Sequence, residues 1–167
     1  MSIHLTVLEI GKMLRNLDAC VEKALAHAEE RKFDPKVLLQ SRLAPDMFPL
    51  IRQIQLACDN ARWAAARTAG KETPAQADDE QTLGDLRGRI AAVAGYLEGF
   101  SPADFAGADE RLVSLPRWGG MSMTGSEYFY QHGLPNFFFH LVTAYALLRH
   151  NGVPLGKRDY LGNLPLR

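Results

Sequence analysis

The sequence has few cysteines, only two in 167 residues. Cys20 and Cys58 lie far apart, and each falls within an apolar pattern of helical spacing. We therefore interpret them as two buried thiols that act as small hydrophobic side chains, not as a disulfide or a metal pair. So sparse a use of cysteine is typical of a reducing compartment, and a cytoplasmic location is expected.

The chain also lacks an excess of charge and a long apolar run. Nineteen Lys and Arg balance nineteen Asp and Glu, so the positive surplus that nucleic-acid binding requires is absent and no such partner is expected. The most apolar stretch, residues 134–148, is about fifteen residues long, whereas a membrane-spanning helix needs about 20. The first residues pass directly into an amphipathic pattern without a basic segment, so neither a signal peptide nor a membrane partner is expected.

Helical periodicity is what the chain does have. Apolar residues recur at steps of three and four, and capping signals mark the helix ends. The pattern predicts four long helices at about residues 5–31, 48–69, 82–97 and 126–151, the last with a break or kink at Gly133-Leu134-Pro135. Residues 70–81 are predicted to be a loop, and residues 111–123, around Gly119-Gly120, a small hairpin.

These elements predict an all-α fold. Four long amphipathic helices with short connections are typical of an up-down four-helix bundle. The hairpin falls in the longest connection, between the third and fourth helices. The length suits one domain, and we expect residues 1–167 to form it.

Several strings resemble the domain-of-unknown-function 1993 family, and the resemblance covers essentially the whole chain. They lie before the second helix and along the C-terminal third: residues 42–50, 53–55, 134–140, 143–153 and 156–162. The resemblance implies a bundle of the DinB/YfiT-like superfamily, usually bacterial and without an established activity. It also implies a homodimer, on whose face Trp63 and Trp118 are candidates.

The superfamily further implies a divalent metal, zinc or nickel, held by three histidines, and in some members a thiol-dependent transferase activity. One of these histidines lies on the second helix, and a His-x-x-x-His pair lies on the fourth. In this chain the pair reads Asn136 and His140, which leaves His140 as the matching metal ligand. The second helix contains no histidine, and its candidate ligands are Gln55, Cys58 and Asp59.

The residues themselves suggest a candidate site on the fourth helix. His132, Asn136 and His140 are spaced i, i+4 and i+8, so they share one face if the helix continues through Pro135. Asp59 or Gln55 from the second helix would complete a mixed cluster, suited to a borderline metal or to a histidine held by a carboxylate for acid–base work. The alternative is a buried polar cluster in which His140 is a core residue hydrogen-bonded to a neighbour.

Three functions follow from these alternatives. The first is a small-molecule-binding or accessory protein with an internal polar pocket near His140. The second is a divalent-metal-dependent enzyme with a degenerate site, in which His140 is a ligand or base. The third is a structural homodimer without a ligand. No nucleophile or phosphate-binding loop favours the second, and the sequence names no substrate.

Overall fold

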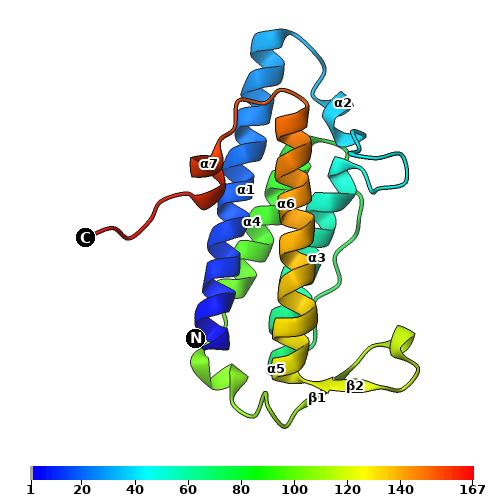
Figure 1. Cartoon of the computed structure of the whole chain (residues 1–167), viewed down its shortest axis with the longest axis vertical. Helices are drawn as coiled ribbons and strands as arrows, with labels where there is room; N and C mark the ends of the chain where they lie inside the picture. Colours follow the sequence, from blue (N-terminus) through cyan, green and yellow to red (C-terminus); the bar gives the residue numbers. More distant parts are fainter. Residues whose placement is uncertain (1) are drawn as a thin grey trace.

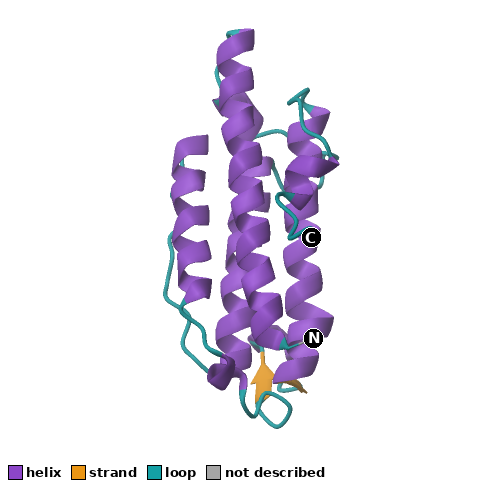
Figure 2. Cartoon of the chain, turned by 90° about the vertical axis from the view of Figure 1, so that its left-hand side faces the viewer, coloured by secondary structure: helices purple, strands orange, loops and turns teal. Residues whose placement is uncertain are grey.

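The computed structural model describes residues 2–167, and helices dominate it. Four long helices in this part of the chain form an elongated bundle: α1 (Ile3–Arg31), α3 (Leu50–Ala69), α4 (Leu83–Glu98) and α6 (Leu134–His150). The shorter elements are α2 (Lys36–Leu39), η1 (Pro102–Phe105), β1 (Leu112–Ser114), η2 (Pro116–Trp118), β2 (Ser122–Thr124), α5 (Gly125–Glu127), η3 (Tyr128–Gly133) and α7 (Lys157–Leu161). The predicted all-α bundle with a hairpin before its last long helix is confirmed (Figure 1, Figure 2).

The helix ends follow the capping signals of the sequence. The Ser2 hydroxyl accepts a hydrogen bond from the Leu5 amide at the start of α1, which ends at Lys32 in a left-handed conformation. The Thr82 side chain and Asp85 form a reciprocal capping box at the start of α4. These caps satisfy amides that would otherwise lack partners at the ends of the helices.

The long helices do not alternate up and down along the chain, which corrects the expected up-down order. Asp59 of α3 pairs with Arg89 of α4, and Lys71 just after α3 lies over the Phe100 ring just after α4. Residue numbers therefore rise together along both helices, so α3 and α4 run parallel. By contrast, α3 runs antiparallel to α6, because Gln53 meets His140 whereas Ala64, further along α3, meets Gly133 just before α6.

An extended segment, residues 71–81, which we call the strap, allows α4 to run parallel to α3. Eleven extended residues reach about 36 Å, more than the ~30 Å length of the 20-residue α3. The strap runs back along α3: Arg62 donates to the Pro74 carbonyl near one end, and Arg52 contacts Asp78 near the other. The loop predicted over residues 70–81 is therefore present, but it crosses the bundle lengthwise.

The final long helix continues through Gly133 and Pro135, so of the predicted break or kink the break is absent, and the helix changes type there. Gly133 has helical torsion angles (φ −62°, ψ −55°), and the Leu134 amide donates to the Phe129 carbonyl five residues back. This i to i−5 bond defines a π-helical turn, η3, which adds one residue to the turn. Proline lacks an amide hydrogen, and the π turn accommodates it within a continuous helix from α5 to α6.

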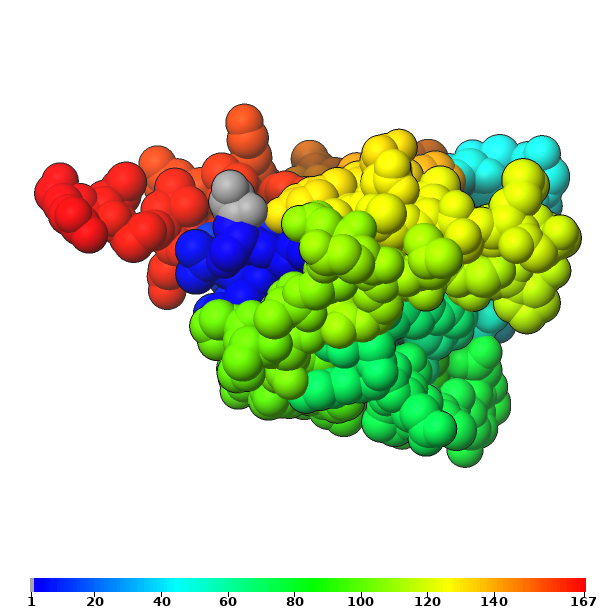
Figure 3. All heavy atoms as spheres, turned by 90° about the horizontal axis from the view of Figure 1, so that it is seen from below, coloured from blue at the N-terminus to red at the C-terminus, as the bar shows by residue number. Residues whose placement is uncertain are grey.

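The hairpin and the C-terminal segment complete the chain. Strands β1 and β2 pair antiparallel with Val113 opposite Met123, at the end of the bundle where α5 begins. Viewed from this end, the connection from α4 to α5 spreads over the helix termini (Figure 3). At the side of the bundle, Lys23 pairs with Asp159 at 2.6 Å and thereby fixes α7 against α1.

Two sequence expectations about the core and the membrane can be compared with the fold. Cys20 and Cys58 are free and buried, as predicted, and burial raises the pKa of the Cys58 thiol to about 12. None of the helices described in residues 2–167 is long and apolar enough to cross a membrane.

Candidate functional site

His140 lies between α6 and α3, where Gln53 holds it. The imidazole is 8% exposed, and its Nδ1 atom is 2.8 Å from the side-chain oxygen of Gln53. The Gln53 amide nitrogen donates in turn to the carbonyl of Phe48, at 3.1 Å. Because both ends of the Gln53 amide are engaged, its oxygen is fixed toward the histidine.

This arrangement sets the tautomer of His140. An amide oxygen can only accept a hydrogen bond, so Nδ1 of His140 must carry the hydrogen and donate it. In the neutral imidazole the lone pair then lies on Nε2. Because Gln53 occupies Nδ1, Nε2 is the ring nitrogen left to bond another group.

The electrostatics keep this histidine neutral. Burial lowers the pKa of His140 below its ordinary value of 6.5, and the nearby Arg52 guanidinium lowers it further. At neutral pH the imidazole is therefore an uncharged hydrogen-bond acceptor with its lone pair on Nε2. Such a group can accept a hydrogen bond from a ligand, take up a proton or bind a metal ion.

Asn136 and His132 share the helix with His140 but do not converge on it. The Asn136 amide nitrogen donates to the carbonyl of His132, one turn back, at 2.6 Å. The His132 ring lies against Tyr128 and Trp118, near the hairpin. The continuous helix therefore keeps the predicted i, i+4 and i+8 spacing, yet the three side chains contact different neighbours.

Asp59 and Gln55 lie elsewhere, contrary to the expectation that one of them would join His140. Asp59 accepts from Arg62 at 2.6 Å and from Arg89 at 2.7 Å, and Gln55 donates to Glu80 of the strap. The helix geometry explains the difference, because two residues along α3 turn a side chain by about 200° from Gln53. Gln53 is thus the partner that the sequence reasoning missed.

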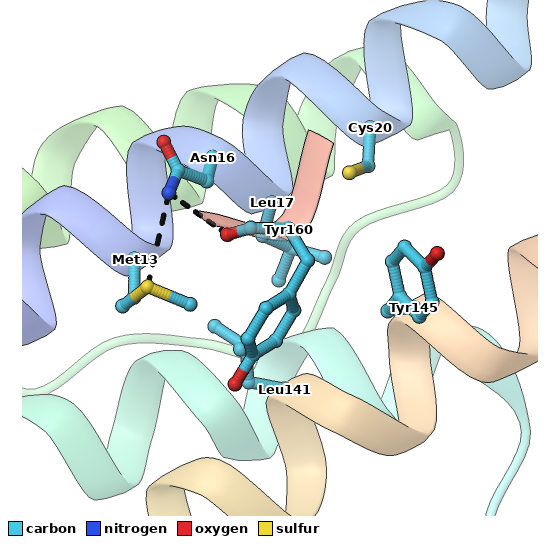
Figure 4. A pocket seen from close by; sticks show the side chains of 7 residues that line it. All are labelled: Met13, Asn16, Leu17, Cys20, Leu141, Tyr145 and Tyr160. Carbon is cyan, nitrogen blue, oxygen red and sulfur yellow. Dashed lines mark hydrogen bonds between the residues drawn. The ribbon is translucent and has the colours of Figure 1, made fainter. Parts of the chain in front are cut away.

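A small cavity lies where α6 meets α1 and α7 (Figure 4). It is lined by Met13, Asn16, Leu17, Cys20, Leu141, Tyr145 and Tyr160. Its volume of about 10 Å³ is close to the minimum for one water molecule, so it has no room for an organic ligand. Burial raises the pKa of the Cys20 thiol beside it to about 11, which makes this cysteine a poor nucleophile.

The comparisons with known proteins place this architecture in a family. The family model for a domain of unknown function, DUF1993, matches residues 3–161. The chain belongs to the DUF1993 family. Among solved structures it is similar to a DinB family member protein from Shewanella denitrificans, with 53% identity, 96% of this chain and 92% of that chain covered, and a TM-score of 0.93. No curated protein matches it.

The residues of this DUF1993 chain do not fit the three-histidine metal site that the DinB-like resemblance implies. Among residues 2–167, no group of three or more His, Cys, Asp or Glu side chains is arranged to hold a metal ion. His140 offers one imidazole nitrogen, whereas both ends of the Gln53 amide and the amide nitrogen of Asn136 are engaged in other bonds. Amide oxygens also lack the charge and softness that zinc and nickel prefer.

Proposed function

We propose that this DUF1993 chain is a small-molecule-binding or accessory protein of bacterial type, and that its ligand contacts His140. The observation that carries the proposal is the fixed tautomer, since the bond to Gln53 leaves the lone pair of His140 on Nε2. A matching ligand would carry a hydrogen-bond donor such as a hydroxyl, thiol or amide. The Phe139 ring, edge-on to the imidazole with centroids 5.1 Å apart, offers an apolar contact beside it.

Thermal-shift measurement with a panel of phenols, thiols and small amides tests this function. At 100 times its dissociation constant, a true ligand adds about 2.7 kcal/mol, which raises the melting temperature by on the order of 5–10 °C in a chain of this size. We expect this shift in the wild type and its loss in His140→Leu. The shift in melting temperature should also be smaller in Gln53→Leu, because the hydrogen of His140 is then no longer held on Nδ1.

The pH dependence separates a hydrogen-bond acceptor from a mere contact residue. The pKa of His140 is depressed, so the acceptor is fully present above pH 6.5 and is lost as the pH falls through the lowered pKa. Binding should weaken in acid accordingly. Equal shifts in His140→Leu, or no His140-dependent compound in the panel, would contradict the function. A shift with Zn²⁺ or Ni²⁺ that depends on His140 would favour the metal enzyme instead.

We also propose that the chain forms a homodimer through the outer face of α6. Phe139 is 57% exposed and Val142 45% exposed, and Pro135 continues the same apolar stripe toward the hairpin end. A stripe of this kind can pair with its own copy about a two-fold axis, and a net charge of zero gives little repulsion between copies.

Sedimentation velocity tests the dimer. At micromolar concentration we expect twice the mass of one chain for the wild type, and one chain for Val142→Glu, because a buried, unpaired carboxylate is costly at an apolar interface. The exposed Val37 on α2 provides the matched control, and Val37→Glu should stay dimeric. A wild-type mass of one chain would rule out the dimer.

A further inference from the structure

A second cluster of polar and aromatic residues lies near the hairpin end of the bundle, apart from His140. We call it the arginine–aromatic cluster, and its members come from α3, η2 and η3: Trp63, Arg67, Arg117, Trp118, Tyr128 and His132. Eight residues of helix separate His132 from His140, roughly 12 Å along the axis. The cluster is therefore distinct from the site proposed above.

One arginine of the cluster holds His132. Arg117 Nη2 lies 2.7 Å from His132 Nε2, and because a guanidinium can only donate, Nε2 accepts. The imidazole is then neutral with its hydrogen on Nδ1. That Nδ1 atom is buried and has no hydrogen-bond partner among residues 2–167. A buried donor without an acceptor is uncommon in folded proteins.

The other arginine lies across the aromatic rings. Arg67 stands over the Trp63 ring at 5.0 Å from its centroid and donates to the Tyr128 hydroxyl at 3.1 Å. The Tyr128 ring is stacked on His132, with centroids 5.3 Å apart and an interplanar angle of 18°. Trp118 packs edge-on against the same imidazole. Each guanidinium group thus contacts one ring of the stacked pair, Arg67 the Tyr128 hydroxyl and Arg117 the His132 imidazole.

The charge of the cluster is uncompensated. Among the described residues, neither Arg67 nor Arg117 forms an ion pair with a carboxylate, whereas Arg52, Arg62 and Arg89 are all paired. Burial lowers the pKa of His132, and Arg117 and Arg67 lower it further. No acidic group contributes to that shift. Neither guanidinium charge is therefore neutralised by an ion pair within the described residues.

We propose that the arginine–aromatic cluster binds a small organic anion, a carboxylate or phosphate attached to a planar ring. The two guanidinium groups would bind the anionic head, since charge-assisted bonds from arginine suit the planar oxygens of carboxylates and phosphates. The indole of Trp118 or Trp63 would contact the ring.

Tryptophan fluorescence tests this directly, because Trp63 and Trp118 are the only two tryptophans in the chain. Phenyl phosphate and benzoate serve as probes, and inorganic phosphate serves as an anion without a ring, all at constant ionic strength. We expect a saturable change with the aromatic anions and weaker binding of inorganic phosphate. Arg67→Gln and Arg117→Gln should each weaken binding of phenyl phosphate about tenfold or more.

The controls separate binding from folding and from the His140 site. Arg117 is exposed, so Arg117→Gln should keep the fold, as circular dichroism would verify. Arg149→Gln, an exposed change at the far end of α6, and His140→Leu should both bind phenyl phosphate as the wild type does. The absence of a saturable change, or equal affinity in the Arg67 and Arg117 variants, would overturn the proposal. Equal affinity for inorganic phosphate would overturn the role of the ring.

Discussion

Replacing Arg89 with methionine is expected to lower the free energy of unfolding by about 3–5 kcal/mol. The Arg89 side chain is 1% exposed and is shared by three carboxylates. It lies 2.7 Å from Asp59 on α3, 2.9 Å from Glu80 and 3.0 Å from Asp78 on the strap. Removal of this cation leaves Asp59 and Glu80 buried with too little compensating charge, and it releases the strap from the bundle.

Chemical denaturation of Arg89→Met measures the effect, and Arg87→Met is its matched control on the same helix. Arg87 also binds carboxylates, with Asp18 at 2.8 Å, but its side chain is 32% exposed. Solvent screens such a pair, so its loss should cost about 0–1 kcal/mol. If Arg87→Met destabilised the chain as much as Arg89→Met, burial of the charge network would not be the cause.

The elements of the bundle could be predicted from local sequence because their causes are local. The capping box at the start of α4 depends only on Thr82 and Asp85. The end of α3 depends on Gly70, a left-handed residue with φ 69°. The direction of α4 could not be predicted this way. It depends on whether residues 71–81 turn sharply or stretch, and that is decided by distant partners such as Arg62 and Arg89.

The candidate site was predicted only in part for a similar reason. His140 is distinctive in an apolar helix, so a buried histidine with a hydrogen-bonding neighbour could be predicted from the sequence. Its partner could not, because Gln53 and Gln55 have the same chemistry and only the packing angle of α3 against α6 decides which one faces His140. The ion pair between Asp59 and Arg89 could not be predicted either, since thirty residues separate them in the sequence.

The π turn at the start of α6 is the clearest case in which packing overrode a local signal. Glycine followed by Leu-Pro normally indicates a helix break. Here Gly133 has ordinary helical torsion angles. It lies against Ala64 of α3, where an added Cβ atom would be too close. The glycine is therefore needed for the approach of two helices and not for a special backbone conformation.

Gly133→Ala should consequently destabilise the protein, although glycine to alanine in a helix usually stabilises by about 0.5–1 kcal/mol. A Cβ atom at Gly133 would lie 2.8 Å from the Ala64 Cβ and 3.3 Å from its Cα, too close without a shift of α3 or η3. Overpacking of this kind costs about 1–3 kcal/mol, which exceeds the gain in helix propensity.

Thermal unfolding compares this variant with Gly95→Ala, a helical glycine of α4 whose added Cβ would meet nothing within 4 Å. Gly95→Ala should raise the melting temperature, and Gly133→Ala should lower it. The double variant Ala64→Gly with Gly133→Ala makes room for the new methyl group, so the two changes should show a favourable coupling of about 0.5–3 kcal/mol. Strictly additive effects, or a stabilised Gly133→Ala, would show that the close contact with Ala64 does not select glycine at this turn.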